Sequence, residues 1–581
     1  MTASCSTWEG EWVRDWAANH FQGSATPPFS FVYGGSPSSE LLRHWTYHQE
    51  AAERDGAKTV YFFTYTDPSS GLQVRVTCTA FADFPAVEWV LHFQNTGAAA
   101  TPMLENVQAL DTVLACAAGG EVALLRTLGS ACAPSDFAPL RQVLAPGEEA
   151  SFAPQGGRSS NISAAPFFNI EMPGQGVAVG IGWSGQWAAR LARVDGSRLR
   201  VQAGMEATHL RLRPGEEIRT PRILLVFWQG DPQRGPNLLR RLVRRHYTPL
   251  IDGKPMLPLV SCNTWFPSGD DGNLANEQNQ LEIIEAYAPL GIEYLVIDAG
   301  WYDGRWPTGV GNWTVRRDAY PNGLKPVADA AHRHGIKFGL WFEPERVSPG
   351  TRLHREHPEW LLQVPGVRDS VLNLGLPEAR HWVADTISDL IDSVGIDYFR
   401  HDFNIDPLPF WRANDASDRQ GMSEIRYVEQ LYALWDELLR RHPTLMIEGC
   451  ASGGRRIDLE SISRSHIYWK SDLYFNSDAN QAHACGANLF LPTNYWNTPL
   501  MAMDDYDLCS SLGGSLCLGW DPRARGFPLE RARAWVQQFK ALRPLMMGDF
   551  YPLLGHSLAE DRPIGFQFHC PDTGRGMAVL F

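Results

Sequence analysis

Two stretches of sequence decide the fold: YLVIDAGW at positions 294–301 and KFGLWFEPE at positions 337–345. Each is a short apolar run that ends in acidic residues, and a helical stretch over 326–334 lies between them. Parallel strands that are buried on both faces read as continuous apolar runs, and they need a crossover helix to connect them. The two stretches therefore predict a strand–helix–strand unit of a parallel sheet.

The same pattern repeats over residues 255–540. Apolar runs alternate with helical stretches, among them 277–288, 380–393 and 424–441. Eight such strands within ~270 residues predict a (β/α)₈ TIM barrel. A doubly wound open sheet is the alternative, but it would have a Gly-rich turn after the first strand, and the sequence has none there. The expected barrel strands are Leu259–Trp265, Tyr294–Asp298, Lys337–Phe342, Asp397–Asp402, Leu445–Cys450, Ile467–Asp472, Asn488–Asn494 and Ser515–Trp520.

The chain on either side of the barrel reads as β structure. Alternating runs at 60–65, 72–76 and 86–93, separated by Gly, Pro, Asp or Ser turns, predict an N-terminal β-sandwich over residues 1–232. Its expected last strand is Ile223–Trp228. A helix within 233–254 should link it to the barrel, with Arg240, Arg241, Arg244 and Arg245 covering the solvated face. Residues 541–581 are expected to begin a C-terminal β domain that is incomplete here.

The amino-acid composition indicates which kinds of molecule and which cell compartment suit the protein. The formal charge of −14 disfavours binding to nucleic acid, while some of the 21 Trp suit stacking on sugar rings. No run approaches the ~18 apolar residues that a membrane span needs, and residues 1–8 lack the features of a signal peptide. The ten Cys are scattered without a CxxC pair, which favours reduced thiols and a cytoplasmic location.

Acidic residues stand at the ends of five expected barrel strands, as in Asp298, Glu343, Asp402, Glu448 and Asp472. Barrel enzymes carry their catalytic groups at the carboxyl ends of the strands. Two carboxyl groups on either side of a scissile bond are what glycoside cleavage requires. One such Asp alone could equally be a helix cap, but five strands with this ending favour a site. No His lies at ligand spacing beside these acids, so neither a metal nor another cofactor is expected.

The barrel sequence resembles the α-galactosidases of glycoside hydrolase family 36 almost continuously from about 258 to 550. The resemblance implies a retaining, cofactor-free barrel enzyme that acts on oligosaccharides or other glycosides, and it leaves room for a homo-oligomer. The motifs that carry it are Tyr294–Trp301, Asn312-Trp313, Pro321–Lys325, Phe338–Pro349 and Arg355–Trp360.

The resemblance also assigns roles to single residues. Asp402 in the stretch RHD matches the family's nucleophile, and Asp472 in WKSD matches its general acid/base. The loop from Cys450 to Arg456 matches the one that meets the 2-substituent of the sugar, with Cys450 and Gly453 at the contacting positions. The other sugar-binding positions that it implies are Asp298, Trp341, Arg368 and Arg400.

Departures from the family pattern affect the expected substrate. Ala299 replaces the second of two paired acids, Arg400 replaces a lysine, and Lys470 replaces a threonine. Lys470 would share a strand face with Asp472 and reach the pocket, or else turn toward solvent or a loop carboxylate. Two loop glycines are replaced by Ser452 and Arg455. Segment 476–483 is expected as a lid, and four further acids are expected in the long loops after strands four and six: Asp406, Asp415, Asp418 and Asp478.

The function predicted from these features is retaining hydrolysis of terminal α-galactosyl residues. Because the pocket is less acidic than the family's, a modified sugar is an alternative: an α-N-acetylgalactosaminide, a 6-deoxy or 6-modified galactoside, or an arabinopyranoside. A transglycosylase would use the same residues. A non-catalytic carbohydrate-binding protein is the alternative of another class; the loss of a catalytic carboxylate would mark it, and both carboxylates are present.

Overall fold

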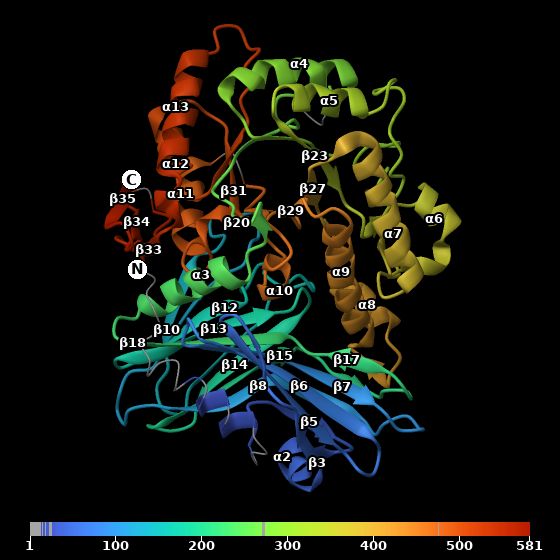
Figure 1. Cartoon of the computed structure of the whole chain (residues 1–581), viewed down its shortest axis with the longest axis vertical. Coiled ribbons are helices and arrows are strands. Elements are labelled where there is room, and N and C mark those ends of the chain that lie inside the picture. Colours follow the sequence, from blue (N-terminus) through green and yellow to red (C-terminus); the bar gives the residue numbers. More distant parts are fainter. Residues whose placement is uncertain are drawn as a thin grey trace.

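The computed structural model describes residues 13, 15–17, 19–21, 26–269, 274–473, 476–559 and 561–581. The expectation about a signal peptide concerns residues 1–8, which lie outside this range, as does Cys5. The described chain forms an antiparallel β domain below a helix-covered barrel, with a small sheet at the side of the barrel (Figure 1). The fold predicted from the sequence is confirmed.

The N-terminal domain consists of two antiparallel sheets, in the part of the chain that the structure describes. Rings and hydrogen bonds join the two sheets: Phe31 and Phe93 lie edge to face at 5.2 Å, and the indole of Trp89 donates to the carbonyl of Ala109 at 2.8 Å. The first sheet contains β1 (Ser30–Tyr33), β2 (Ser36–Pro37), β8 (Leu104–Ala115), β11 (Glu149–Phe152), β14 (Trp187–Arg193), β15 (Arg198–Met205), β16 (His209–Leu210) and, from the barrel, β28 (Arg419–Gln420). The second contains β3 (Thr46–Gln49), β4 (Glu53–Asp55), β5 (Lys58–Thr66), β6 (Leu72–Phe81), β7 (Ala86–Asn95), β9 (Ala123–Thr127), β10 (Pro139–Val143), β12 (Phe167–Met172), β13 (Gln175–Gly182), β17 (Glu217–Arg219) and β18 (Arg222–Gln229).

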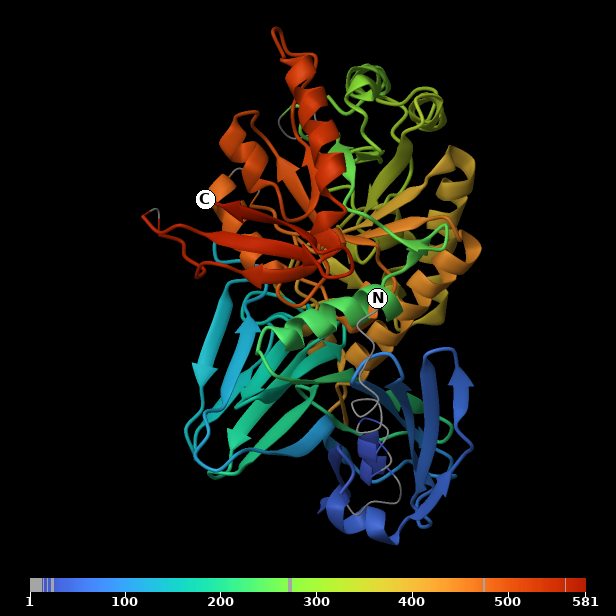
Figure 2. The ribbon, with the colours of Figure 1, turned by 60° about the vertical axis from the view of Figure 1, so that its left-hand side comes forward.

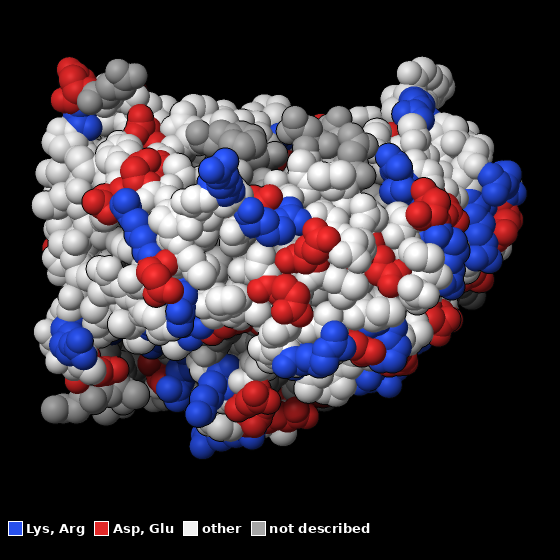
Figure 3. Space-filling view, turned by 90° about the horizontal axis from the view of Figure 1, so that it is seen from above, with Lys and Arg blue, Asp and Glu red and all other residues white. Residues whose placement is uncertain are grey.

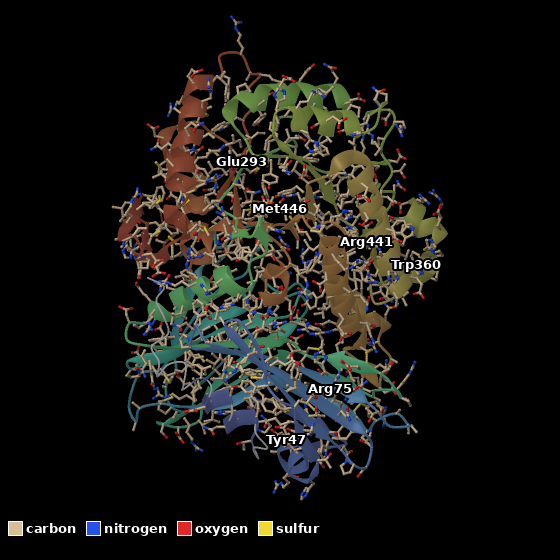
Figure 4. The ribbon with its side chains drawn as sticks, viewed as in Figure 1. Tyr47, Arg75, Glu293, Trp360, Arg441 and Met446 are labelled. Carbon is tan, nitrogen blue, oxygen red and sulfur yellow. The ribbon has the colours of Figure 1, made fainter. Side chains whose placement is uncertain are left out.

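The barrel is closed, because β32 returns to pair in parallel with β21 through Val260 and Leu516. Its interior holds a cluster that includes Val296, Tyr398 and Met446, and Figure 4 shows Met446 at the centre of the barrel. The strands are β21 (Val260–Asn263), β22 (Tyr294–Ile297), β23 (Lys337–Phe342), β27 (Tyr398–His401), β29 (Met446–Gly449), β30 (Ile467–Trp469), β31 (Trp496–Leu500) and β32 (Ser515–Leu518). The helices around it are α4 (Glu277–Tyr287), α5 (Lys325–Arg333), α6 (Arg352–Glu356), α7 (Pro377–Leu390), α8 (Leu408–Asn414), α9 (Met422–Arg441), α10 (Leu459–Ile462), α11 (Ser477–Ala487), α12 (Asp505–Ser510) and α13 (Leu529–Leu542).

The prediction that residues 488–494 form the seventh barrel strand is wrong. The seventh strand is β31, which begins at Trp496. The apolar run at 488–494 is fully buried but lies between α11 and β31. Its carbonyls at Asn488 and Leu491 accept hydrogen bonds from the guanidinium of Arg240. A distant side chain therefore satisfies backbone groups that the sequence pattern assigned to a strand ladder. Pro499 within β31 also weakens the strand signal of the true segment.

The linking helix is α3 (Arg234–His246), which lies between the two domains (Figure 2). The prediction that Arg240 covers a solvated face of this helix is wrong. Its side chain is 4% exposed and donates to the carbonyls of Asn488 and Leu491. Arg241 pairs with Asp549 of the C-terminal sheet. Residues 247–255 are not helical and include the short pair β19 (Leu250–Ile251) and β20 (Lys254–Pro255). The C-terminal sheet is β33 (Asp549–Pro552), β34 (Gly565–Cys570) and β35 (Arg575–Leu580).

Segment 476–483, expected as a lid, is instead the start of α11, whose residues 479–487 are buried. Asp478 lies in its first helical turn, and Asp415 accepts hydrogen bonds from the amides of Gly421 and Ser423. Lys and Arg side chains are interspersed with Asp and Glu over the face in Figure 3. In the described part of the chain, no helix is long and apolar enough to cross a membrane.

Candidate active site

The strand ends of the barrel bring most of the predicted site residues together. Asp298 follows β22, Trp341 lies in β23, and Asp402 follows Arg400 and His401 at the end of β27. All these strands are parallel and adjacent, so their carboxyl ends meet at one rim. His401 points away from this rim: it contacts Glu345 at 2.8 Å and accepts a hydrogen bond from a tryptophan indole at 2.8 Å.

The carboxylate of Asp402 is buried and surrounded by hydrogen-bond donors. Its Oδ2 accepts from Trp341 Nε1 at 3.2 Å and from Asn404 Nδ2 at 2.8 Å. Its Oδ1 accepts from the backbone amides of the next residue and of Ser452, at 2.8 and 3.2 Å. Burial alone would raise the pKa of Asp402, but the Arg400 guanidinium and these donors hold it below the usual value. Asp402 is therefore a fixed, ionised carboxylate.

Arg400 places a buried positive charge beside this carboxylate. Its Nη1 donates to Glu448 at 2.7 Å, and its Nε lies 3.4 Å from Asp298 Oδ2. The guanidinium also stacks over the ring of Trp469, 4.5 Å from its centroid. Because a planar guanidinium can hold two acids and an aromatic face at once, the Arg at this position ties three strand ends together.

Asp298 is the one acid of the family's pair that this chain retains. Its carboxylate accepts hydrogen bonds from Asn263 Nδ2 at 2.5 Å and from the amide of Ala299 at 2.8 Å. Burial raises the pKa of Asp298, although the Arg400 guanidinium opposes the shift. Ala299 itself is 4% exposed, so an apolar group fills the position of the second acid.

Asp472 lies three residues beyond the end of β30. Its side chain is exposed, but the surrounding protein still partly desolvates its carboxyl group. Trp469 Nε1 donates to its Oδ1 at 2.9 Å. Burial and the charge of Asp402 together raise the pKa of Asp472 to about 6, although the Arg400 guanidinium opposes the shift. The charge of Asp402 thus acts on Asp472, and the pKa values of the two expected catalytic acids are shifted in opposite directions.

The loop after β29 packs directly against Asp472. Gly453 has φ +81°, and a Cβ built on it would lie 3.0 Å from Ser471 Cα and 3.1 Å from Asp472 N. Only glycine fits such a contact and such a backbone angle. Cys450, at the start of the loop, is buried, and its thiol hydrogen-bonds Asp402. The loop therefore joins both expected catalytic residues.

The N-terminal domain contributes to this site, which sequence reasoning missed. The guanidinium of Arg158 donates to the carbonyls of Phe403 at 3.1 Å and Ala451 at 2.9 Å, and it pairs with Asp406 at 2.5 Å. These carbonyls belong to the loops that follow β27 and β29. Arg158 thus fixes the backbone next to Asp402 from another domain.

A second contribution is the turn 130–136, which is organised by the buried carboxylate of Asp136. Its oxygens accept from Ser130 Oγ at 2.7 Å and from the amides of Ala131 and Cys132 at 2.6 and 3.2 Å. They also accept from Ser471 Oγ at 2.6 Å, next to Asp472 in the chain. Asp136 therefore ties the N-terminal domain to the strand end that carries the expected acid/base.

Replacing Asp136 by asparagine is expected to lower kcat by about ten- to a hundredfold with little change in KM. The NH₂ group of the asparagine would replace one carboxylate oxygen, so a donor would face the donors that Asp136 now accepts from. The repulsion would displace Ser471, and with it Asp472. Steady-state kinetics over a pH range provide the test, because a displaced Asp472 also shifts the alkaline limb of the profile.

The matched control is Asp195→Asn in an exposed turn of the same domain, where Asp195 accepts from Ser197 N at 2.8 Å and Oγ at 2.9 Å. It should leave both constants unchanged. Equal kcat losses in the two variants, or a purely thermal-stability effect of Asp136→Asn, would contradict the positioning role.

Lys470 interacts with the loop carboxylate of Asp136, one of the orientations expected for it from the sequence. Its side chain is buried, and its charge interacts with Asp136, Cys485 and His483. Burial lowers the pKa of Lys470 to about 7, against the attraction of Asp136. The strand ends at Trp469, so the alternation that would have aligned residues 470 and 472 no longer applies.

Arg368 is exposed in the loop between β25 (Leu361–Leu362) and β26 (Ser370–Leu372), and the structure does not bring it to the other site residues. Its role stays a prediction. Within the described residues, no group of three or more His, Cys, Asp or Glu side chains could hold a metal ion.

Several residues of the site were not predicted. Asn263 is a polar residue inside an apolar strand, a signal that could have identified it. Asn404, two residues after Asp402, could have been found from its position alone. Arg158 and Asp136 carry no comparable signal, because their partners lie 245 and 335 residues away in the chain.

Residues 220–493 match the model of the melibiase family. The α-galactosidase Mel36A of Lactobacillus acidophilus is 31% identical over 319 residues, which cover 53% of this chain and 43% of that protein. An α-galactosidase of Escherichia coli is 33% identical over 332 residues, or 55% of this chain and 44% of that protein. This chain therefore matches less than half the length of these two relatives.

The fold has close counterparts among solved structures. The α-galactosidase AgaA of Geobacillus stearothermophilus superposes with a TM-score of 0.81 at 22% identity, over 95% of this chain and 80% of that one. An α-galactosidase of Lactobacillus brevis gives a TM-score of 0.82 at 22% identity, over 95% and 78%. An AgaA variant in complex with stachyose gives 0.80 over the same 95% of this chain.

Proposed function

We propose that this chain, which is α-galactosidase-like and of the glycoside hydrolase family 36 type, hydrolyses terminal α-galactosyl residues with retention of configuration. The observation that carries the proposal is that Asp402 and Asp472 follow strands of the same barrel and act on each other electrostatically, with the pKa of Asp402 lowered and that of Asp472 raised to about 6. An ionised carboxylate next to a protonated one is what the first step of a retaining glycosidase requires. Similarity to α-galactosidases, one of them in complex with stachyose, supports oligosaccharides as the substrate class.

In the first step, Asp402 attacks the anomeric carbon while Asp472 gives its proton to the departing oxygen. The C–O bond to the leaving group breaks, and a β-linked glycosyl ester forms on Asp402. In the second step, the ionised Asp472 takes a proton from water, which attacks the same carbon and releases the sugar. Two inversions give net retention. Arg400 stabilises the negative charge that moves between the two carboxylates.

The sugar pocket differs from the family pattern where Ala299 stands. Asp298 remains to accept one hydroxyl, and the neighbouring position offers only an apolar surface. One lost hydrogen bond to a charged group corresponds to ~1.5–3 kcal/mol of binding free energy. This supports the narrower proposal that the enzyme accepts, in addition to galactosides, glycosides in which the 6-hydroxyl group of the galactose is altered or absent.

The proposal is tested with 4-nitrophenyl α-D-galactopyranoside and NMR detection of the first anomer released. We expect α-galactose first, with β-galactose appearing only by mutarotation. A first product of β configuration would exclude the retaining mechanism. Parallel assays with the α-N-acetylgalactosaminide and the β-L-arabinopyranoside identify the sugar, and product analysis at high acceptor concentration separates hydrolysis from transglycosylation.

The rate is expected to depend on pH in a bell shape. Asp472 must hold its proton, so kcat/KM should fall as the pH rises through about 6. Asp402 must be ionised, and because its pKa lies below the usual value, the acidic limb should appear only below the normal range of an Asp. A pH profile with 4-nitrophenyl α-D-galactopyranoside checks this.

A 2,4-dinitrophenyl galactoside is the matched control, because its leaving group needs no proton. Its alkaline limb should be flattened, whereas identical limbs for both substrates would argue against Asp472 as the acid.

We also propose a reducing compartment such as the cytoplasm for this protein. Nine of its ten cysteines are free thiols, all within the described residues. Free thiols on this scale are typical of reducing environments.

A further inference from the structure

We propose that Arg455, held next to Asp472 by Cys132, forms a subsite for an anionic group on the leaving-group side of the scissile bond. The preferred aglycone would then carry a carboxylate, sulfate or phosphate. The inference rests on the proposed glycosidase function and names the class of substrate within it.

One sulfur atom connects Arg455 to the expected acid/base. Arg455 Nη2 lies 3.0 Å from Cys132 Sγ and donates to it. The same thiol donates to the carbonyl of Ser452 at 3.2 Å and hydrogen-bonds the backbone of Asp472. The guanidinium is therefore separated from the backbone of Asp472 by a single side-chain atom, and Cys132 reaches this place from the N-terminal domain.

The backbone of Arg455 is fixed as well. Its carbonyl accepts from the amide of Ser160 at 2.9 Å, and its own amide donates to the carbonyl of Gly453 at 3.0 Å. Gly453 in turn packs against the amide of Asp472, whose nitrogen lies 3.1 Å from the position that a Cβ on Gly453 would occupy. A preorganised cation at this point needs little ordering when it binds a charged group.

The other arginines around the pocket already have carboxylate partners. Arg400 pairs with Glu448, and three more arginines around the site form ion pairs at 2.5–3.0 Å: Arg158 with Asp406, Arg346 with Glu343 and Asp369, and Arg456 with Glu345. Arg455 differs: no carboxylate among the residues that the structure describes lies within salt-bridge distance of it. Its Nε is buried and has no hydrogen-bond partner in the same range.

Burial of a charged group without a counter-charge is unfavourable, and a guanidinium does not lose its proton to avoid it. Among the described residues, the guanidinium of Arg455 donates one hydrogen bond, to a thiol, so several of its N–H groups are left for a bidentate anion. Arg455 is half-exposed, which leaves it open to a ligand. The charge of Arg455 already acts on Asp472 and lowers its pKa, but no carboxylate of the described residues forms an ion pair with it, and a substrate anion would supply that partner.

The position of Arg455 relative to the two carboxylates indicates which part of the substrate it meets. Asp402 receives its donors from Trp341, Asn404 and the 403 and 452 amides, and Arg455 is not among them. Arg455 instead lies on the side of Asp472 and of the N-terminal domain. The general acid faces the departing oxygen. Side chains that lie next to Asp472, on the side away from Asp402, therefore border the aglycone.

The test compares 4-carboxyphenyl and 4-carbamoylphenyl α-galactosides, which have the same shape and differ in charge. The preference for the carboxylate, as a ratio of kcat/KM values, should fall about tenfold or more (~1.4 kcal/mol) in Arg455→Gln, mainly through KM. Differences in leaving-group chemistry cancel because the same pair is used with each enzyme. The preference of the wild type should also weaken with added salt.

Arg533→Gln is the control, since Arg533 is a surface cation on α13 that pairs with Glu530 at 3.2 Å. It should keep the wild-type ratio, and Arg455→Lys should keep part of it because the charge remains. An unchanged ratio in Arg455→Gln, or an equal change in Arg533→Gln, overturns the inference.

Failure of the glycosidase proposal can be told apart from failure of this one. If the wild type hydrolyses 4-nitrophenyl α-galactoside but shows no charge-dependent ratio, only the subsite is wrong. If it hydrolyses neither, calorimetric binding of the two glycosides to wild type and Arg455→Gln decides. A carboxylate advantage that Arg455→Gln loses supports the subsite, and the lack of such an advantage contradicts it.

Discussion

Replacing Asp402 by alanine is expected to reduce turnover of 4-nitrophenyl α-D-galactopyranoside by at least about 10⁴-fold. The nucleophile of a covalent mechanism cannot be replaced by its neighbours, and losses of this size or larger follow its removal. Arg400 keeps Glu448 and Asp298 as partners in this variant, so the fold should persist. The measurement is the initial rate, together with a melting curve that shows a folded protein.

Asp418→Asn is the control for this experiment, because Asp418 is an exposed acid in the loop after the same strand. It should leave turnover unchanged. Azide gives a further test of the role: in Asp402→Ala it can enter the vacated face and should form β-galactosyl azide. Formation of the α-azide, or turnover close to that of the wild type, would show that Asp402 is not the nucleophile.

Replacing Asp472 by alanine is expected to lower kcat/KM by about 10²–10⁴-fold for substrates with poor leaving groups. The loss arises because no proton reaches the departing oxygen. With a 2,4-dinitrophenyl leaving group the first step should be nearly normal, and the slow step becomes attack of water on the glycosyl-enzyme. A series of aryl galactosides, plotted against leaving-group pKa, measures this dependence.

In this variant azide replaces the water that Asp472 would have activated, so it should speed turnover and yield α-galactosyl azide. Asp478→Ala is the matched control: this acid lies six residues further on and contacts Tyr506 OH at 2.6 Å. A loss that is uniform across all leaving groups would remove Asp472 from the role of acid/base.

The barrel and its order of acidic strand ends could be predicted from the sequence. The apolar runs at 294–298 and 337–342 are short-range patterns, and closure of eight such strands places Asp298 and Asp402 at a common rim whatever else the chain does. The N-terminal sheets could be predicted in the same way, because alternation along a strand reports which face is buried.

The seventh strand could not be found by that route. A buried apolar run has the same pattern whether its carbonyls bond to a neighbouring strand or to a side chain. At 488–491 the partner is Arg240, about 250 residues earlier in the chain. The pattern of one segment carries no information about such a partner.

The sequence by itself determined the architecture and the two candidate acids, Asp402 and Asp472. Only the tertiary structure decided what surrounds them: Asp136 and Cys132 arrive from the N-terminal domain, and Lys470 is buried where the charge of Asp136 acts on it. The physical reason is that periodicity follows from local backbone geometry, whereas charge balance and desolvation depend on groups that only folding brings together.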